Sequence, residues 1–267
     1  LLINSPQNIS FLPVTNDGSL IINSSFAVSL VWVSYAYTGW NSTVYIAGEI
    51  KNPQKNIHYS LLISTAFVMI LYILLNFIFL YSTPISEMKG MIEVGFIAGV
   101  QIFGEQGGKI VSGGIAILLL STISSYVFIG PRITQVIGED FTYLRFFAKK
   151  NHSGIPINGF IFQLLISLAF IFTSTFEQVL LYAGITFIII NTITVIGVMT
   201  LRYTQPDLKR PYKSWGYPWT QIIFTFSNTW ILYFTFKNQT FESLIGIGII
   251  FFSLIIYFSG QKITKKG

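Results

Sequence analysis

The sequence contains no cysteine and few charged residues. Without cysteine, these 267 residues have no disulfide framework, no thiol nucleophile and no cysteine metal site. Charged residues make up only 10% of the chain, whereas they are about a quarter of a soluble domain. We also find no HExxH motif and no Ser/His/Asp set, and a membrane enzyme would need such a cluster. These absences argue against a soluble domain and an enzyme.

Hydrophobic residues are what the chain has instead, at 52% of its length with a mean hydropathy of +0.64. The segment from Leu61 to Tyr81 carries no charge and is long enough to cross a hydrocarbon core of about 30 Å. Because the apolar runs do not alternate as barrel strands would, we expect an all-α membrane protein. Seven spans are predicted, at 26–46, 61–81, 110–129, 159–172, 179–201, 221–236 and 244–258.

The basic residues orient these spans. Of the 16 Lys and Arg residues, 13 follow the first, third, fifth and seventh spans. Since cytoplasmic loops are enriched in Lys and Arg, residues 1–25 are predicted to form an external loop and the C-terminus to be cytoplasmic. The net charge of +6 and the pI of about 9.4 therefore report topology, and we expect no nucleic-acid partner.

Two segments between spans have their own character. Residues 84–105 repeat apolar side chains every three or four positions, which predicts an amphipathic helix on the outer surface. It is either a plain interfacial helix or part of the closure of an external access path. Residues 202–220 contain Pro206, Pro211 and Pro218, and proline stops helices, so we expect an extended cytoplasmic loop. Residues 221–267 are predicted to hold two trailing spans and a cytoplasmic tail.

The first span is interrupted near its centre by polar and small residues. Gly39 costs about 1 kcal/mol in a helix interior, and Thr38 and Ser42 can bond locally to the backbone. An unwound turn in lipid leaves polar backbone groups without partners, so it persists only where protein, water or a ligand supplies them. Transporters place such breaks around their substrates. The alternative is that Gly39 is a small-residue contact between unbroken helices.

The stretch "SYAYTGWNSTVYIAGEIKNPQKN", residues 34–56, resembles the sixth span and following loop of amino acid permeases of the amino acid–polyamine–organocation superfamily, L-type branch. "STISSYVFIGPRITQVIGED" resembles the eighth span, and "RPYKSWGYP" the loop after the tenth. The chain departs from the family where Thr38 replaces the first glycine of a common pair. It also has "VIGED" where the family has a "MARDG"-like run.

The resemblance implies a LeuT-like inverted-repeat fold in which residues 26–201 form the second five-helix repeat. These seven spans would be the sixth to twelfth of twelve, so we expect the chain to be a portion of a longer multi-pass protein of the cell membrane. The missing N-terminal five spans would then supply the other broken helix. The abundance of Ile, Asn, Lys and Phe suggests a bacterial, AT-rich genome.

The resemblance also assigns residues. The backbone carbonyls near Tyr35, Ala36 and Thr38 would bind the substrate ammonium, and Tyr35 would be an aromatic gate. The implied substrate-binding set is Tyr35, Ala36, Tyr37, Thr38, Gly39, Trp40 and Asn41. Possible ion or gate residues are Ser121, Ser124, Ser125, Glu49 and Arg132. Each is also consistent with ordinary packing or helix–helix hydrogen bonding, and Arg132 with a helix C-terminus.

We therefore expect a secondary transporter of amino acids working by alternating access. We expect no cofactor, no metal and no disulfide-linked partner, whereas a coupling ion, sodium or proton, stays open. A polyamine or amino-sugar permease of the same superfamily is the main alternative. A seven-span receptor matches the topology but not the broken first span.

Overall fold

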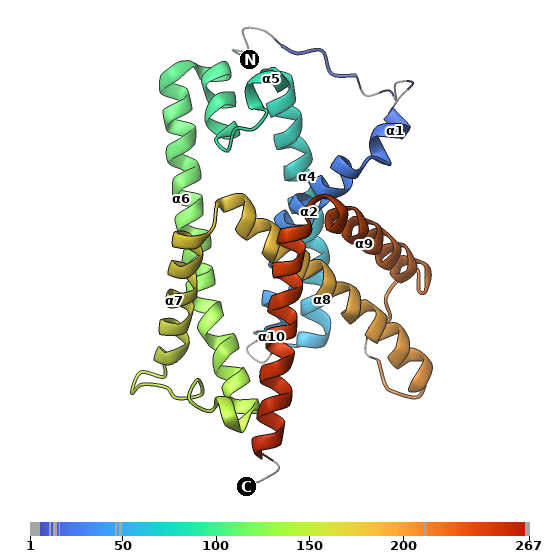
Figure 1. Ribbon diagram of the computed structural model, residues 1–267. Coiled ribbons are helices and arrows are strands. Elements are labelled where there is room, and N and C mark those ends of the chain that lie inside the picture. The colour runs from blue at the N-terminus through green and yellow to red at the C-terminus, as the bar shows by residue number, and fades with distance from the viewer. Residues whose placement is uncertain are drawn as a thin grey trace. The chain divides into compact units, whose positions relative to one another are not determined.

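The computed structural model describes residues 6–10, 12, 15, 17–45, 47, 50–210 and 212–264. Helices, turns and irregular segments make up this described part of the chain. Figure 1 shows the helices in chain order. They are α1 (Asp17–Ile21), α2 (Ser24–Ala36), α3 (Ser42–Tyr45), α4 (Pro53–Ser82), α5 (Ile85–Met88), α6 (Val94–Asp140), the 3-10 helix η2 (Thr142–Leu144), α7 (Ile157–Thr173), α8 (Phe176–Thr204), α9 (Trp219–Asn238) and α10 (Thr240–Thr264).

Four of these helices, α4, α6, α8 and α10, are long and apolar enough to cross a membrane, while α2 and α7 are shorter apolar helices. Every range predicted as a span contains a helix. The all-helical class and the multi-pass membrane character are therefore confirmed. The number of spans and the division into a repeat and two trailing helices stay predictions.

The chain divides into two compact units. Within the second unit, residues 15–57 and 131–267, α2 packs against α8 and α9, and α8 packs against α9 and α10. The core between them contains Val31, Leu181, Ile188 and Ile231, with Trp32 and Trp230 at its edge. Apolar side chains of α8 and α9 thus pack against the middle of α2.

Helix α8 starts and ends at local signals. Thr175 caps its N-terminus by accepting a hydrogen bond from the Gln178 backbone, and the Gln178 side chain accepts one from the Thr175 backbone. This reciprocal pair satisfies two backbone donors that a helix start otherwise leaves unpaired. At the other end, the Arg210 guanidinium donates to the carbonyls of Leu201 and Gln205. Residues 205–210 and 212–218 lie outside helices, whereas 202–204 and 219–220 of the loop predicted at 202–220 belong to α8 and α9. The cytoplasmic position of this connection stays a prediction.

The first unit, residues 1–14 and 58–130, contains a sharp bend in α6. At Gly104 the backbone has φ 75° and ψ −179°, and the chain doubles back. A Cβ on Gly99 would lie 3.1 Å from the Gly108 Cα atom, and one on Gly95 2.6 Å from the Ile115 side chain. Glycine on both arms thus lets two helical segments approach closely.

The prediction of one continuous amphipathic helix over 84–105 is wrong. Helix α5 ends at Met88, a turn with Gly90 at φ 79° follows, and helix resumes at Val94. Glycine at a positive φ is a common way to end a helix. The prediction missed this end because the apolar repeat of the sequence continues on both sides of Gly90. The pieces are linked by a hydrogen bond from the Gln101 side chain to the Glu87 carboxylate, at 2.9 Å.

Candidate functional site

The predicted interruption of the first span is confirmed. Helix α2 ends at Ala36, residues 37–41 form turns, and α3 begins at Ser42. Gly39 has φ 105°, a backbone conformation that a residue with a Cβ adopts only at a cost. The alternative, a glycine contact between unbroken helices, does not describe this segment.

Several of the backbone groups in the turn are satisfied from within the chain. The Tyr37 N–H donates to the Val33 carbonyl at 3.3 Å, and the Ser42 N–H donates to the Gly39 carbonyl at 3.0 Å. The Tyr35 carbonyl accepts two hydrogen bonds from Thr38, one from its N–H at 2.9 Å and one from its hydroxyl at 2.7 Å. Because a carbonyl oxygen has two lone pairs, Thr38 uses both acceptor positions of Tyr35.

The helix before the break is fixed by a close approach to α8. A Cβ on Gly184 would lie 2.6 Å from a methyl group of Val31, so glycine is required for this spacing. Val31 is buried, at 1% exposure. Val31 lies less than two turns before Ala36, so this contact holds the last part of α2 close to the turn of residues 37–41.

The side chains of the predicted substrate-binding set are unevenly exposed. Trp40 is 46% exposed and Ala36 is also exposed. Tyr35, Tyr37, Thr38 and Asn41 are half-buried. The set therefore consists of the last two residues of α2 and the turn that follows it, and it is partly open. Its assignment to a substrate, and the gate role of Tyr35, stay predictions.

The predicted ion residues lie in the other unit. Ser121, Ser124 and Ser125 are exposed side chains on α6. The Ser125 hydroxyl donates to the Ser121 carbonyl at 3.1 Å, and the neighbouring Thr122 hydroxyl donates to the Leu118 carbonyl. These bonds to the preceding turn are what hydroxyls commonly make inside membrane helices, so the ion role stays a prediction.

The ion or gate roles of Arg132 and Glu49 are not tested. Arg132 is half-buried on α6, one residue after Pro131, whereas Glu49 lies outside the described residues. The roles of these two residues stay predictions.

Sequence reasoning missed two residues that shape the break. Thr38 was recognised as a departure from glycine, but not as the donor that covers the Tyr35 carbonyl. Its hydroxyl, three residues after Tyr35, was the available signal, because Thr commonly bonds to backbone three or four residues earlier. Gly184 carried no comparable signal, because its importance comes from a contact with a residue 153 positions away.

Comparison with known proteins identifies the family of this chain. The family model described as "Amino acid permease" matches residues 2–260. Among similar proteins are mouse solute carrier family 7 member 12, at 28% identity over 80% of this chain and 46% of its own length. The serine/threonine exchanger SteT of Bacillus subtilis (strain 168) is 24% identical over 91% of this chain and 56% of its own length.

A third relative, the mouse large neutral amino acids transporter small subunit 2, is 25% identical over 88% of this chain and 44% of its own length. The chain thus spans about half the length of the relatives it matches. The family match, in contrast, covers nearly all of the chain. This chain belongs to the amino acid permease family, within the amino acid–polyamine–organocation superfamily.

Proposed function

We propose that this chain forms the substrate-binding second repeat and the trailing helices of a secondary transporter that moves amino acids by alternating access. The observation that supports this best is the turn of residues 37–41. It interrupts an apolar helix and is anchored on one side by a packed core. Membership of the permease family agrees with transport rather than an enzymatic reaction.

The break suits a zwitterionic solute. An amino acid brings an ammonium donor and a carboxylate acceptor, which are complementary to backbone groups at interrupted helices. In our proposal the substrate lies against Tyr35–Asn41, and the preceding spans of a twelve-span LeuT-like protein supply the other side. The protein would work in the cell membrane of a bacterium, with residues 17–25 near the external face.

Thr38 refines the expected contact with the ammonium group. Because the Tyr35 carbonyl already accepts two bonds from Thr38, it lacks a lone pair for the substrate. The Thr38 hydroxyl donates its proton to Tyr35 and retains acceptor capacity on its oxygen. We therefore place the ammonium donor on the Thr38 oxygen, which gives a chain of two hydrogen bonds that polarise one another.

Exchange of neutral amino acids is the transport mode we favour. The relatives include a protein named as a serine/threonine exchanger and one named as a large neutral amino acids transporter. The described turn, 37–41, carries no charged side chain, so a substrate with a neutral side chain meets no unpaired charge there.

The test uses the full-length protein in lipid vesicles. Labelled serine, threonine and leucine are offered outside, with unlabelled amino acid inside or without it, and with or without a sodium or proton gradient. We expect uptake that internal amino acid accelerates. Failure to transport any amino acid under every gradient, or transport of polyamines alone, would contradict the proposal.

A further inference from the structure

The end of α6 carries a turn, residues 138–149, that the transport proposal does not use. We call it the interfacial turn. A Cβ on Gly138 would lie 2.6 Å from the Ala148 nitrogen and 2.9 Å from the Leu144 oxygen. Only glycine allows the chain to fold back this closely on α6, so the turn is a built feature rather than a loose connection.

Neighbouring helices hold the interfacial turn from two directions. From α7, the Asn158 side chain donates to the Phe146 carbonyl at 2.7 Å, and the Phe147 and Phe162 rings meet edge to face. From α10, the Tyr257 ring meets Phe141 edge to face. The ring of Tyr143 also packs directly on Gly260 of α10, where any Cβ would overlap it. The backbone of the turn is therefore fixed before any ligand binds.

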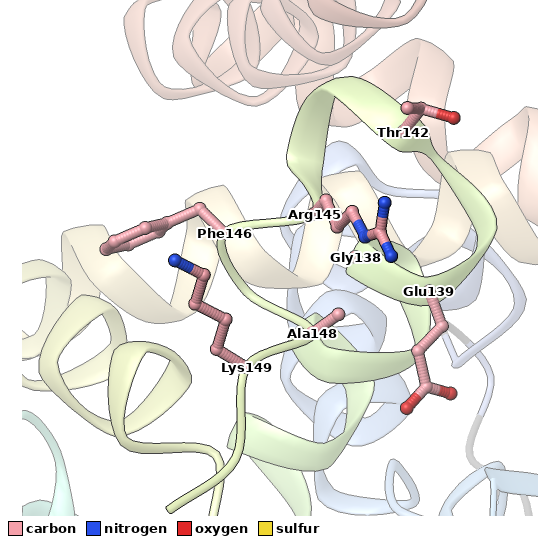
Figure 2. A pocket seen from close by; sticks show the side chains of 7 residues that line it. All are labelled: Gly138, Glu139, Thr142, Arg145, Phe146, Ala148 and Lys149. Atoms are coloured by element: carbon pink, nitrogen blue, oxygen red, sulfur yellow. The ribbon is translucent and has the colours of Figure 1, made fainter.

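This fixed turn surrounds a pocket of about 870 Å³. Its lining is Gly138, Glu139, Thr142, Arg145, Phe146, Ala148 and Lys149. Figure 2 shows the Arg145 guanidinium and the Lys149 amine pointing in different directions, with the Lys149 amine on the same side as the Phe146 ring. In the same view the Glu139 carboxylate points away from the Arg145 guanidinium.

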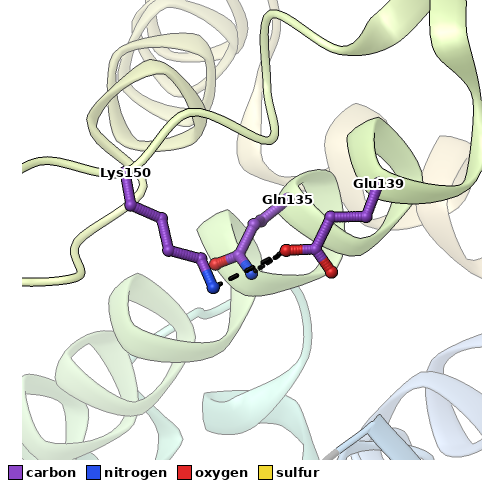
Figure 3. Close-up of polar contacts among 3 residues, drawn as sticks. All are labelled: Gln135, Glu139 and Lys150. Atoms are coloured by element: carbon purple, nitrogen blue, oxygen red, sulfur yellow. Dashed lines mark hydrogen bonds and ion pairs between the residues drawn. The ribbon is translucent and has the colours of Figure 1, made fainter.

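The one acidic side chain of the lining is engaged elsewhere. The Glu139 carboxylate accepts a hydrogen bond from the Gln135 amide at 2.7 Å and pairs with the Lys150 amine at 3.6 Å (Figure 3). Both contacts reach the same carboxylate oxygen, Oε1. With Glu139 paired to Lys150, the excess charge of the pocket is positive and comes from Arg145 and Lys149.

The segment also exposes apolar side chains. Phe146, which lines the pocket, is 61% exposed, and Val136, two residues before Gly138 on α6, is 49% exposed. The basic residues of this segment also belong to the set that predicts a cytoplasmic position. A pocket with cations next to exposed apolar side chains, at the cytoplasmic end of a membrane helix, matches a lipid with an anionic headgroup.

We propose that the interfacial turn binds the phosphate headgroup of an anionic phospholipid of the cytoplasmic leaflet. Arg145 and Lys149, which both line the pocket, contact the headgroup, and the acyl chains lie along the exposed side chains of Phe146 and Val136. A free phosphate shares the anionic chemistry, but it leaves these apolar side chains exposed to water. The proposal is independent of which solute the protein transports.

The test is a lipid titration of the detergent-solubilised full-length protein. Melting temperature is followed while short-chain phosphatidylglycerol, short-chain phosphatidylcholine or inorganic phosphate is added, because a ligand of the folded state raises it by mass action. We expect saturable stabilisation by phosphatidylglycerol alone. Equal stabilisation by phosphatidylcholine would overturn the headgroup assignment, and equal stabilisation by phosphate would identify a free-anion site instead.

Two matched double variants locate the effect. Each basic residue near an anionic surface contributes about fivefold in affinity, so Arg145→Gln with Lys149→Gln should weaken phosphatidylglycerol binding about 25-fold. Lys209→Gln with Lys213→Gln removes the same charge from exposed positions in the loop before α9. This variant should change the affinity for phosphatidylglycerol by less than about twofold. Equal losses in both variants would overturn the site. If the first variant does not fold, Arg145→Lys with Lys149→Arg, which keeps the charge, must retain binding.

Discussion

The helical structure of this protein is interrupted at a glycine in two places. One interruption lies between α2 and α3, and the other lies within α6. At the first, residues 37–41 leave the helix and Thr38 bonds back to the Tyr35 carbonyl. At the second, Gly104 alone has non-helical dihedral angles, and a Cβ there would meet nothing within 4 Å. Both glycines have positive φ, 105° at Gly39 and 75° at Gly104.

The difference lies in what surrounds each interruption. The bend at Gly104 is followed by an exposed ion pair between Glu105 and Lys109, so water can satisfy its backbone. The turn at 37–41 interrupts an apolar run and is followed by another helix, α3. Several of its backbone groups are paired within the chain, and a solute can supply partners for others. A glycine at positive φ therefore bends the chain within α6, whereas after α2 it forms, in our proposal, part of a binding site.

Replacing the two glycines should separate these roles and gives the largest expected effect. Alanine in a backbone conformation that residues with a Cβ rarely adopt costs about 1–3 kcal/mol, so Gly39→Ala and Gly104→Ala should both lower stability by about this much. Because Gly39 shapes the proposed binding turn, Gly39→Ala should also reduce amino acid uptake at least about tenfold, equivalent to about 1.4 kcal/mol. Uptake into vesicles, normalised to folded protein, measures this.

Gly104→Ala is the matched control for that experiment. It should keep uptake within about twofold of the unsubstituted protein despite its loss of stability. If both variants lose transport equally, the proposal that Gly39 shapes a binding site while Gly104 only bends α6 is wrong.

The Thr38 hydroxyl provides the next largest effect. A hydrogen bond to a charged group contributes about 1.5–3 kcal/mol, so Thr38→Val should raise the KM for amino acids about tenfold or more. Thr38→Ser keeps the hydroxyl and should change KM less than about threefold. The assay is uptake against substrate concentration, and a Thr38→Val variant with unchanged or lower KM would instead favour the Tyr35 carbonyl as the ammonium acceptor.

On α8, substitution of Gly184, which contacts α2, should lower stability more than substitution of Gly197, which has open space around it. Gly184→Ala places a Cβ against Val31, and overpacking of this kind costs about 1–3 kcal/mol. Gly197→Ala, also on α8, meets nothing within 4 Å and should be neutral or slightly stabilising, because alanine favours helix. Thermal unfolding in detergent compares the two, and equal melting temperatures would contradict the anchoring contact.

The surface ion pair beside the bend should have the smallest effect. Glu105 and Lys109 are 3.0 Å apart, with side chains that are 76% and 57% exposed, and such pairs contribute about 0.2–1 kcal/mol. Lys109→Gln should therefore change stability by less than about 1 kcal/mol and leave uptake unchanged. A larger loss in the same unfolding assay would show that the bend depends on this pair.

Much of the fold followed from local sequence. Low charge and long apolar runs predicted the helices, and Thr38 and Gly39 predicted the interruption, because backbone preference and hydrophobicity act locally. The single helix over 84–105 was wrong because a helical repeat continued across Gly90, and periodicity does not register one residue at positive φ.

The site was predictable only as a location. The position of the turn could be predicted, but the double bond from Thr38 to Tyr35 depends on a rotamer and on where the helix ends. The contact of Gly184 with Val31 and of Gly138 with residues 144–148 depends on tertiary packing, which a single sequence does not encode in any local pattern. The roles of Ser121, Glu49 and Arg132 stay predictions.

The most direct test of the central claim is substrate protection at the break. The 267 residues contain no cysteine, so Ser42→Cys, at the start of α3, introduces one thiol beside the turn with little change in size. Ser153→Cys, in the exposed loop before α7, is the control. The binding account predicts that saturating neutral amino acid slows thiol labelling of Ser42→Cys and leaves Ser153→Cys unchanged; equal labelling rates with and without amino acid at Ser42→Cys would contradict it.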